Sequence, residues 1–250
     1  ALIGENGAGK STLIKTIAGA IQPDSGTINI DDKQFKYMTP QLSEQMGIAT
    51  IYQEFNLVDE LSASENIFLG KKLSKTPFIN KKLMYKKSKE VFEQLNIDIN
   101  PDKLVKNLTV GYQQMVEIAK AVIQNAKVLI MDEPSAPLTV VEIESMFNLI
   151  AELNKRNVSI IYISHRLDEI FRISNRVTVM RDGKKISTLN TKDTNVDELI
   201  SLMVGRKMSE TFPKREPNNS DDTLLEVKNL SGNGIRNISF KLKKGEILGF

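Results

Sequence analysis

The sequence predicts an α/β fold: a mostly parallel sheet with a small antiparallel β subdomain and an inserted helical subdomain. Three observations predict it. Apolar, β-branched segments at residues 47–52, 128–131 and 158–163 each end in polar residues, as buried parallel strands do. Residues from about 62 to 125 carry helical patterns and interrupt the alternation of strands and helices. A short alternating segment at residues 27–30, before a tight turn, predicts the antiparallel part.

The first element is a glycine-rich loop that opens a helix. Its residues fit the pattern G-x-x-x-x-G-K-[ST] at every fixed position: Gly4, Glu5, Asn6, Gly7, Ala8, Gly9, Lys10, Ser11 and Thr12. The glycines let the backbone curl so that its N–H groups converge on phosphate oxygens, which Lys10 also meets as a point charge. The Ser11 hydroxyl is placed to bind Mg²⁺. The alternative is a glycine-rich turn before an ordinary helix, and the number of matched positions argues against it.

The elements that follow the loop alternate between helices and strands. A helix over residues 11–18 turns its positive N-terminal end toward the phosphates, and Gly19 ends it. The next expected elements are strands at 27–30 and after 33, a helix at 40–45, a strand at 47–52, and helices beginning near 64, 83 and 112. Beyond the strand at 128–131 we expect a strand at 158–163, a hairpin around 182–183, and helices at 141–153, 168–173 and 196–204.

Polar side chains stand where three of the predicted strands end. Asp132 and Glu133 follow one strand, and adjacent side chains there point in different directions. One carboxylate then reaches Mg²⁺ through water while the other polarises an attacking water. Gln53 offers an amide oxygen to Mg²⁺ or to that water, and His165, the one histidine of the sequence, offers a neutral imidazole to a γ-phosphate. The alternatives are a surface acidic pair, an incidental glutamine and a structural histidine.

The composition sets limits on the compartment and on the partners. Of 250 residues, 40% are hydrophobic and 26% are charged, and the net charge is +3. Cysteine is absent, so no disulfide is expected and a reducing cytoplasm is the natural compartment. The longest apolar runs are far shorter than the roughly 18 residues that a membrane span needs, so we expect any work at a membrane to go through partners. Lysines gather between residues 71 and 89, where interleaved apolar residues favour a solvated helix face over attraction to anionic lipid or nucleic acid.

These motifs resemble those of the ATP-binding-cassette (ABC) ATPases, a branch of the P-loop NTPases. In this resemblance, residues 4–12 form the Walker A loop and residues 128–133 form Walker B with its following glutamate. Gln53 fits the Q-loop and His165 the H-switch. The resemblance covers residues 1 to about 205, and it implies the P-loop fold with an inserted helical subdomain.

Within this family the resemblance is strongest to the ATP-binding subunits of bacterial monosaccharide importers of the ribose, galactose and xylose type. Residues 113–120 and 164–170 carry it, together with the Walker A loop. It implies an ATPase that binds ATP and Mg²⁺ and energises sugar import through membrane permease subunits, with a solute-binding protein as an indirect partner. Such a subunit lies peripherally on the cytoplasmic face of the cell membrane, and no nucleic acid is expected among its partners.

The resemblance also implies a role for each site residue. Glu133 is the general base, His165 positions the attacking water, and Lys10 offsets charge on the transferred phosphate. Mg²⁺ is held by Ser11, Gln53 and Asp132, and the Walker A loop together with Gln53 binds the nucleotide. The family's signature segment is expected to complete the phosphate site of a second cassette, in the same full-length chain; it comprises Leu108, Thr109, Val110 and Gly111.

The domain organisation is expected to be one cassette, a linker and the beginning of a second cassette. Residues 1–204 form the first cassette, with its helical subdomain at about 62–125, and residues 205–222 form the linker because proline, acidic and asparagine residues gather there. Residues 223–250 resemble the opening strands of a second cassette, with strands expected at 224–227 and 238–242 and a third beginning at 245, so a fragment of a longer tandem ATPase is expected. The opening strands and the adenine-stacking residue would then precede residue 1. A weaker hypothesis is a circular permutant, in which the tail strands fill that place.

Two departures from the family pattern concern segments that act across the pair of cassettes. Val110 and Tyr112 replace a glycine and a glutamine of the signature, and after Glu133 the chain has Pro137 and lacks the expected aspartate. We therefore expect ATP binding by this cassette more firmly than we expect this cassette to complete the phosphate site of a second cassette. Other functions left open are a nucleoside importer, a soluble ABC protein acting on nucleic acid or ribosomes, and a regulatory cassette that hardly hydrolyses ATP.

Overall fold

The computed structural model describes residues 1–71, 79–205 and 221–249. The chain divides into two compact units, Ala1–Arg206 and Lys207–Phe250, and each is described by itself. Most of the predicted linker at 205–222 lies outside the described residues, as does Lys72 of the lysine-rich segment. The assignment of residues 223–250 to a second cassette stays a prediction.

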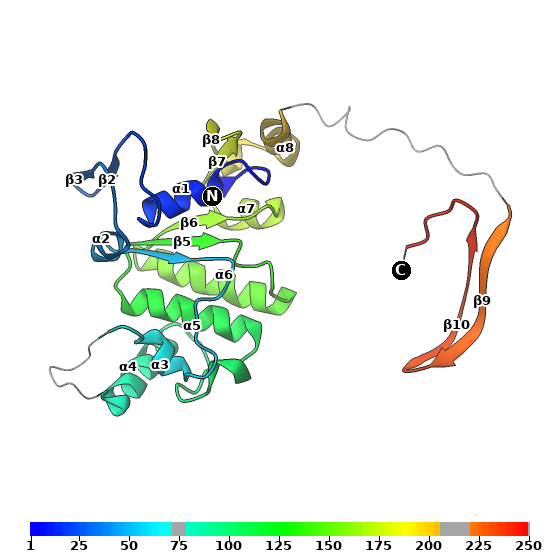
Figure 1. Cartoon of the computed structure of the whole chain (residues 1–250), viewed down its shortest axis with the longest axis horizontal. Helices are drawn as coiled ribbons and strands as arrows, with labels where there is room; N and C mark the ends of the chain where they lie inside the picture. Colours follow the sequence, from blue (N-terminus) through cyan, green and yellow to red (C-terminus); the bar gives the residue numbers. More distant parts are fainter. Residues whose placement is uncertain (72–78, 206–220, 250) are drawn as a thin grey trace. The chain divides into compact units, whose positions relative to one another are not determined.

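The first unit is built on a six-stranded sheet with the order β4-β5-β6-β1-β7-β8 (Figure 1). Its strands are β1 (Leu2–Ile3), β4 (Ile48–Ile51), β5 (Val128–Asp132), β6 (Ser159–Ile163), β7 (Arg176–Arg181) and β8 (Lys184–Asn190). All neighbours pair in parallel except β7 and β8. The small antiparallel sheet pairs β2 (Ile28–Ile30) with β3 (Lys33–Phe35). The predicted fold class is confirmed.

Helices cover both faces of the sheet because its strands bury alternate residues on opposite sides. On β5, Leu129 and Met131 face one way and join a core cluster with residues of α5 (Val110–Ile123) and α6 (Val140–Lys155). Ile130 faces the other way and packs in a second cluster with Ile14 of α1 (Lys10–Ile17). The three successive buried residues of β5 are therefore what a parallel sheet covered by helices on both faces requires.

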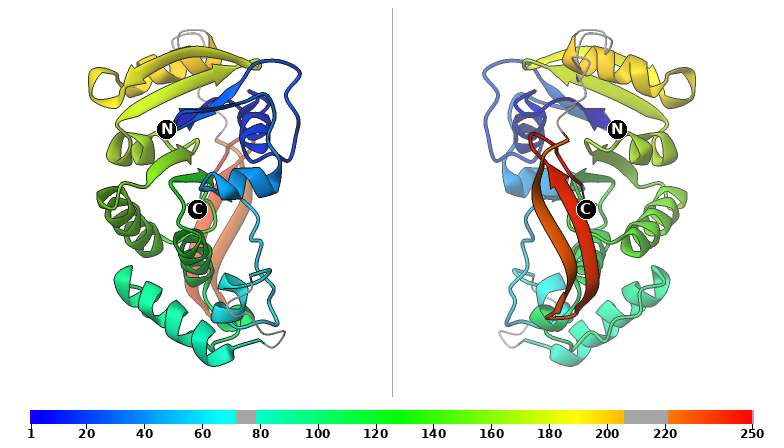
Figure 2. Two further views of the ribbon diagram at one scale, coloured as in Figure 1. Left: turned by 90° about the vertical axis from the view of Figure 1, so that its left-hand side faces the viewer. Right: turned by 90° about the vertical axis from the view of Figure 1, so that its right-hand side faces the viewer.

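The helices occupy nearly the positions that the sequence predicts. They are α1 (Lys10–Ile17), α2 (Pro40–Gln45), α3 (Ala63–Ile67), α4 (Lys81–Gln94), α5 (Val110–Ile123), α6 (Val140–Lys155), α7 (Leu167–Ile173) and α8 (Val196–Val204), with 3-10 turns at Val105–Asn107 and Thr191–Asp193. Helices α3 and α4 lie at the end of the unit remote from β7 and β8, as Figures 1 and 2 both show. In the described part of the chain, no helix is both long and apolar enough to cross a membrane.

The lysines of α4 lie on a solvated face, as the sequence predicts. Lys86 and Lys89 are exposed, and each lies 3.9 Å from the glutamate four residues later on the same helix. Exposed pairs of this kind contribute at most a few tenths of a kcal/mol. Phe92 and Met84 supply the buried face of α4.

The second unit contains one antiparallel hairpin, β9 (Thr223–Gly232) paired with β10 (Ile235–Lys243). The turn is made by Asn233 and Gly234, both with positive φ, as a two-residue hairpin turn requires. The sequence predicts a third strand from residue 245 onward, and this prediction is wrong for residues 246–249, which have no regular structure. An apolar segment becomes a strand only when a neighbour accepts and donates its backbone hydrogen bonds.

Candidate active site

The glycine-rich loop spans residues 4–9, between the end of β1 and the start of α1. Gly7 and Gly9 have φ values of 83° and 93°, in the left-handed region that favours glycine. A Cβ on Gly7 would meet nothing within 4 Å, so the loop opens to free space there. Gly4 is needed for a different reason, because a Cβ at that position would lie 2.3 Å from the backbone oxygen of Met180 on β7. The loop is thus packed against the sheet on one side and open on the other.

Lys10 begins α1 and folds back over this loop. Its side chain is 8% exposed, and Nζ donates to the carbonyl oxygens of Gly4 at 2.8 Å and Glu5 at 3.1 Å. No side chain caps the N-terminus of α1, where Gly9 holds the cap position. The first N–H groups of the helix and the Lys10 ammonium therefore face the same small region, which suits an anionic phosphate.

Asp132 and Ser11 meet where β5 ends beside α1. The Ser11 hydroxyl lies near the Asp132 carboxylate and favours its ionised form. Burial, and next the negative charge of Glu133, raise the pKa of Asp132 above its ordinary value, whereas Lys10 and Lys15 oppose the shift. A half-buried carboxylate near a hydroxyl, with a phosphate site next to it, fits the oxygen ligands that Mg²⁺ prefers.

Replacing Asp132 with asparagine is expected to stabilise the nucleotide-free protein at neutral pH. A carboxyl with a raised pKa in the folded protein lowers the free energy of unfolding once it ionises, and this effect is absent below the unfolded value near 3.8. Thermal midpoints of the two proteins should therefore converge as the pH falls toward about 4 and separate as it rises. A lower midpoint for D132N at neutral pH would contradict the burial argument.

The same variant is expected to weaken Mg²⁺-dependent nucleotide binding.

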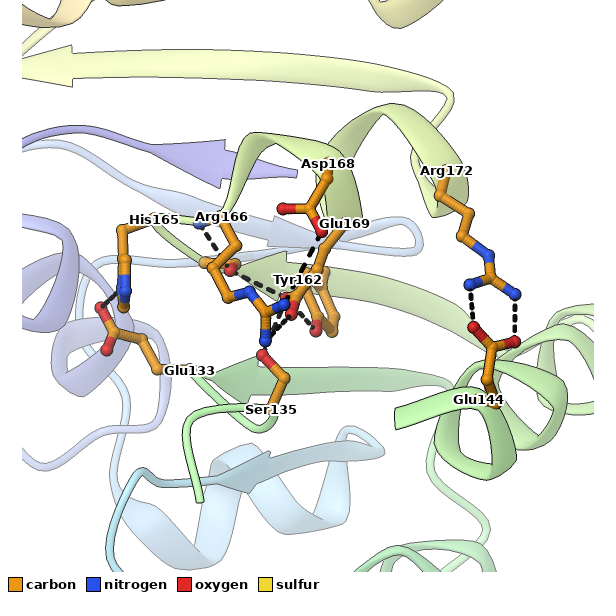
Figure 3. Close-up of polar contacts among 10 residues, drawn as sticks. Glu133, Ser135, Glu144, Tyr162, His165, Arg166, Asp168, Glu169 and Arg172 are labelled. Atoms are coloured by element: carbon orange, nitrogen blue, oxygen red, sulfur yellow. Dashed lines mark hydrogen bonds and ion pairs between the residues drawn. The ribbon is translucent and has the colours of Figure 1, made fainter. Parts of the chain in front are cut away.

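Glu133 and His165 come together although they follow different strands. Glu133 has a left-handed backbone with φ of 48°, and its N–H donates to the carbonyl oxygen of Ile163 at 2.9 Å. That bond ties the residue to β6 and turns its side chain toward the segment after β6. His165 Nδ1 lies 3.2 Å from Glu133 Oε1 (Figure 3). The glutamate side chain is 18% exposed and the histidine 61%, so the pair lies at the mouth of the site.

Gln53 lies just beyond β4 and is exposed. It lines a cavity of about 720 Å³ together with Glu54, Phe55, Leu57, Asp59, Gln113, Ala136 and Pro137. Among hydrogen bonds of the described residues, none joins Gln53 to Ser11 or Asp132. The structure therefore places Gln53 between the helical subdomain and the segment after β5, and its proposed contact with a metal stays a prediction.

The signature segment begins α5, and one carboxylate that the sequence analysis missed anchors it. Leu108 is buried, Thr109 caps the helix, and Val110 is 38% exposed. Glu142 Oε1 accepts from the Thr109 hydroxyl at 3.0 Å and from the Gly111 N–H at 3.1 Å. A Cβ on Gly111 would lie 2.4 Å from Glu142, which explains the glycine.

The other oxygen of Glu142 caps its own helix. Oε2 accepts from the Thr139 N–H at 3.0 Å and hydroxyl at 2.9 Å, and these bonds, the backbone one first, lower the pKa of Glu142. The N-termini of α5 and α6 thus share one carboxylate. The available signal was local: Thr139 and Glu142 form the T-x-x-E pattern of a capping box.

Comparison with known proteins identifies the family. The sequence model of the family described as ABC transporter matches residues 1–136. The chain is 49% identical to the ribose import ATP-binding protein RbsA of Bacillus licheniformis, over all of this chain and 51% of that protein. It is 45% identical to the galactose/methyl galactoside import ATP-binding protein MglA of Clostridium perfringens, over 48% of that protein. The chain therefore spans about half the length of these curated relatives.

Solved structures show the same fold. The ADP conformation of an ATP-binding cassette of an ABC transporter has a TM-score of 0.71 and 26% identity, covering 82% of this chain and 87% of the other. The protein cbiO1 from Clostridium perfringens, part of the ABC transporter complex cbiONQ, has a TM-score of 0.67 and 25% identity, covering 84% of each chain. The motifs, the fold and the family match agree, and the chain belongs to the ABC transporter family of ATP-binding cassettes.

Proposed function

We propose that this chain binds and hydrolyses ATP and thereby energises the import of a monosaccharide through a membrane permease. The observation that carries the proposal is the contact between Glu133 and His165 beside the phosphate loop, 3.2 Å apart. A carboxylate and an imidazole at the ends of neighbouring parallel strands, next to a buried lysine, suit proton transfer from water during attack on a phosphate. The sugar specificity is supported by the names of the relatives, which are ribose and galactose import proteins.

Each residue would contribute a distinct part of the chemistry. Lys10 and the loop N–H groups bind the phosphate oxygens and offset their charge. Glu133 accepts a proton from the attacking water, and His165 holds the carboxylate through Nδ1 while its second ring nitrogen serves the water or the phosphate. Ser11 and Asp132 hold Mg²⁺, with Gln53 as a further ligand, and the metal when bound would draw charge from the phosphate oxygens.

The partners follow from the surfaces around the site. The signature segment, from Leu108 to Gly111, would complete the phosphate site of a second cassette. The cavity beside Gln53 lies between the helical subdomain and the sheet, and it is where closure would be passed to permease subunits. A solute-binding protein would deliver the sugar on the other side of the membrane, with this chain peripheral on the cytoplasmic face.

One observation favours a second candidate, a cassette that holds ATP but hydrolyses it slowly. The Thr109 hydroxyl and the Gly111 N–H, which would meet a partner's phosphate, are already bonded to Glu142. A carboxylate at that place competes with a phosphate for the same donors. Comparing the basal turnover of the wild type and of E142A distinguishes the two candidates, since release of the donors would raise turnover only if Glu142 restrains it.

The direct test is transport by the assembled complex. Liposomes that contain the protein, its permease and its binding protein are expected to accumulate labelled ribose or galactose only when Mg-ATP is inside with this chain. Uptake of a nucleoside but neither sugar would favour a nucleoside importer. Salt-sensitive binding to RNA, without turnover that responds to any solute, would favour a soluble protein acting on nucleic acid.

A further inference from the structure

Glu169 is a buried carboxylate that the proposed chemistry does not use. It lies on α7 and is 1% exposed. Its Oε2 accepts three hydrogen bonds from hydroxyl groups: Ser135 at 2.8 Å, Tyr162 at 2.8 Å and Ser164 at 2.9 Å (Figure 3). Buried hydroxyl groups need an acceptor, and here three of them share one oxygen, so the carboxylate joins three points of the chain.

The charge of Glu169 is balanced by one guanidinium group. Arg166 Nη1 lies 3.2 Å from Glu169 Oε1, and its Nη2 lies 3.7 Å from Asp168. The Oε1 atom has no hydrogen bond of good geometry within the described residues, so Arg166 acts on it mainly through charge. Burial, and next the charge of Glu169, raise the pKa of Tyr162, so this hydroxyl stays protonated and remains a donor.

The three donors come from the two segments that carry the reacting pair. Ser135 is two residues after Glu133, and Ser164 immediately precedes His165. The Ser164 hydroxyl also accepts from the Arg166 N–H at 3.0 Å, which fixes the backbone on the far side of the histidine. One buried oxygen therefore holds the chain just before His165 and just beyond Glu133, and the Ser164 hydroxyl that it binds also holds the residue after His165.

The backbones of the two segments are joined by the sheet, through the bond from the Glu133 N–H to the Ile163 carbonyl oxygen, but the side chains of the reacting pair have few contacts of their own. His165 is 61% exposed, so packing does not fix its ring. Among the described residues, His165 is the one basic side chain within 4 Å of the Glu133 carboxylate. Beyond the last sheet bond, the separation of the two segments is set by side-chain contacts, and the hydroxyl bonds to Glu169 are buried contacts that join them.

From these contacts we infer that Glu169 is a positioning residue for hydrolysis: it clamps the segments of Glu133 and His165 so that the two side chains meet. The inference rests on the proposed function. A displacement of about 1 Å in such a pair is enough to cost roughly 10²-fold in rate.

The test compares E169Q with a matched carboxylate variant, E144Q. Glu144 lies on α6 and also pairs with an arginine, Arg172, but on the surface and away from the reacting pair (Figure 3). E169Q is expected to lower kcat for ATP hydrolysis by about 10- to 100-fold while KM for ATP stays within about twofold of the wild-type value. E144Q is expected to change neither, and E169D to restore part of the rate.

A second measurement does not depend on turnover. His165 is the only histidine of the chain, so its imidazole C–H signals in an NMR spectrum need no assignment when the affinity tag lacks histidine. We expect E169Q and E133Q each to move these signals, and E144Q to leave them in place. S135A and Y162F each remove one hydrogen-bond donor from Glu169. If E169Q does not fold, these variants replace it in the comparison with E144Q.

The outcomes separate the inference from the proposed function. If folded E169Q, or S135A in its place, keeps wild-type histidine signals and wild-type kcat, the clamp is refuted. If the wild type hydrolyses no ATP, the proposed function fails, and the histidine signals alone then decide whether Glu169 positions the pair.

Discussion

Replacing Glu133 with glutamine is expected to lower the rate constant of ATP hydrolysis by about 10²- to 10⁴-fold, the usual contribution of a positioned general base. Glutamine keeps the size of the side chain and its hydrogen-bonding capacity toward His165, 3.2 Å away, but cannot take a proton from water. The left-handed backbone at this position, with φ of 48°, is as accessible to glutamine as to glutamate. The fold and the phosphate loop should therefore be unchanged.

The measurement is single-turnover hydrolysis with saturating Mg-ATP, together with nucleotide affinity by titration calorimetry. Affinity should stay within about threefold, because the loss is confined to the transition state. E144Q serves as the control, since Glu144 is an exposed carboxylate bonded to Arg172. A hydrolysis rate for E133Q equal to that of the wild type would remove Glu133 from the mechanism and leave the slow-cassette alternative in its place.

Replacing Lys10 with alanine is expected to weaken Mg-ATP binding by about 10²-fold, the value of one strong charge-assisted hydrogen bond of about 3 kcal/mol. Two effects add. The ammonium that faces the phosphates is lost, and the carbonyl oxygens of Gly4 and Glu5, bonded at 2.8 and 3.1 Å, lose their donor. The loop that should receive the nucleotide therefore loosens at the same time.

A binding titration of a fluorescent ATP analogue measures this loss. Lys86→Ala is the control, because Lys86 is 75% exposed on α4 and its replacement removes the same charge from the protein. Lys10→Arg is not expected to restore binding, since the side chain of Lys10 is 8% exposed and a planar guanidinium does not fit where a compact ammonium did. Equal affinity in K10A and K86A would show that the lysine acts only on the loop backbone or not at all.

The parts of the fold that can be predicted from the sequence are those that depend on residues close together in the chain. The phosphate loop, the helix after it and the buried strand β5 each carry their signal within about a dozen residues. The meeting of Glu133 and His165 was also predictable, because the carboxyl ends of neighbouring parallel strands share one edge of the sheet.

The contacts that sequence reasoning missed join residues far apart in the chain. Glu142 bonds to a segment that begins 33 residues earlier, at Thr109, and Glu169 bonds to Ser135, 34 residues earlier. In sequence each is an acidic residue within a helical pattern, where exposed acids are common. The third strand expected near residue 245 failed for a related reason, because a strand needs a partner that its own sequence does not reveal.

The place of β1 in the sheet has a consequence for synthesis. Leu2 pairs with Ile163 on one side and Thr178 on the other, so the strand that carries the phosphate loop needs neighbours about 160 to 175 residues later in the chain. At roughly 5–20 residues per second, a ribosome delivers those neighbours only some 10 to 30 seconds after β1 has emerged. Until then its apolar residues have no native partner strand. Contacts of such long range slow folding, so nascent chains should rely on chaperones most before β6 and β7 are made.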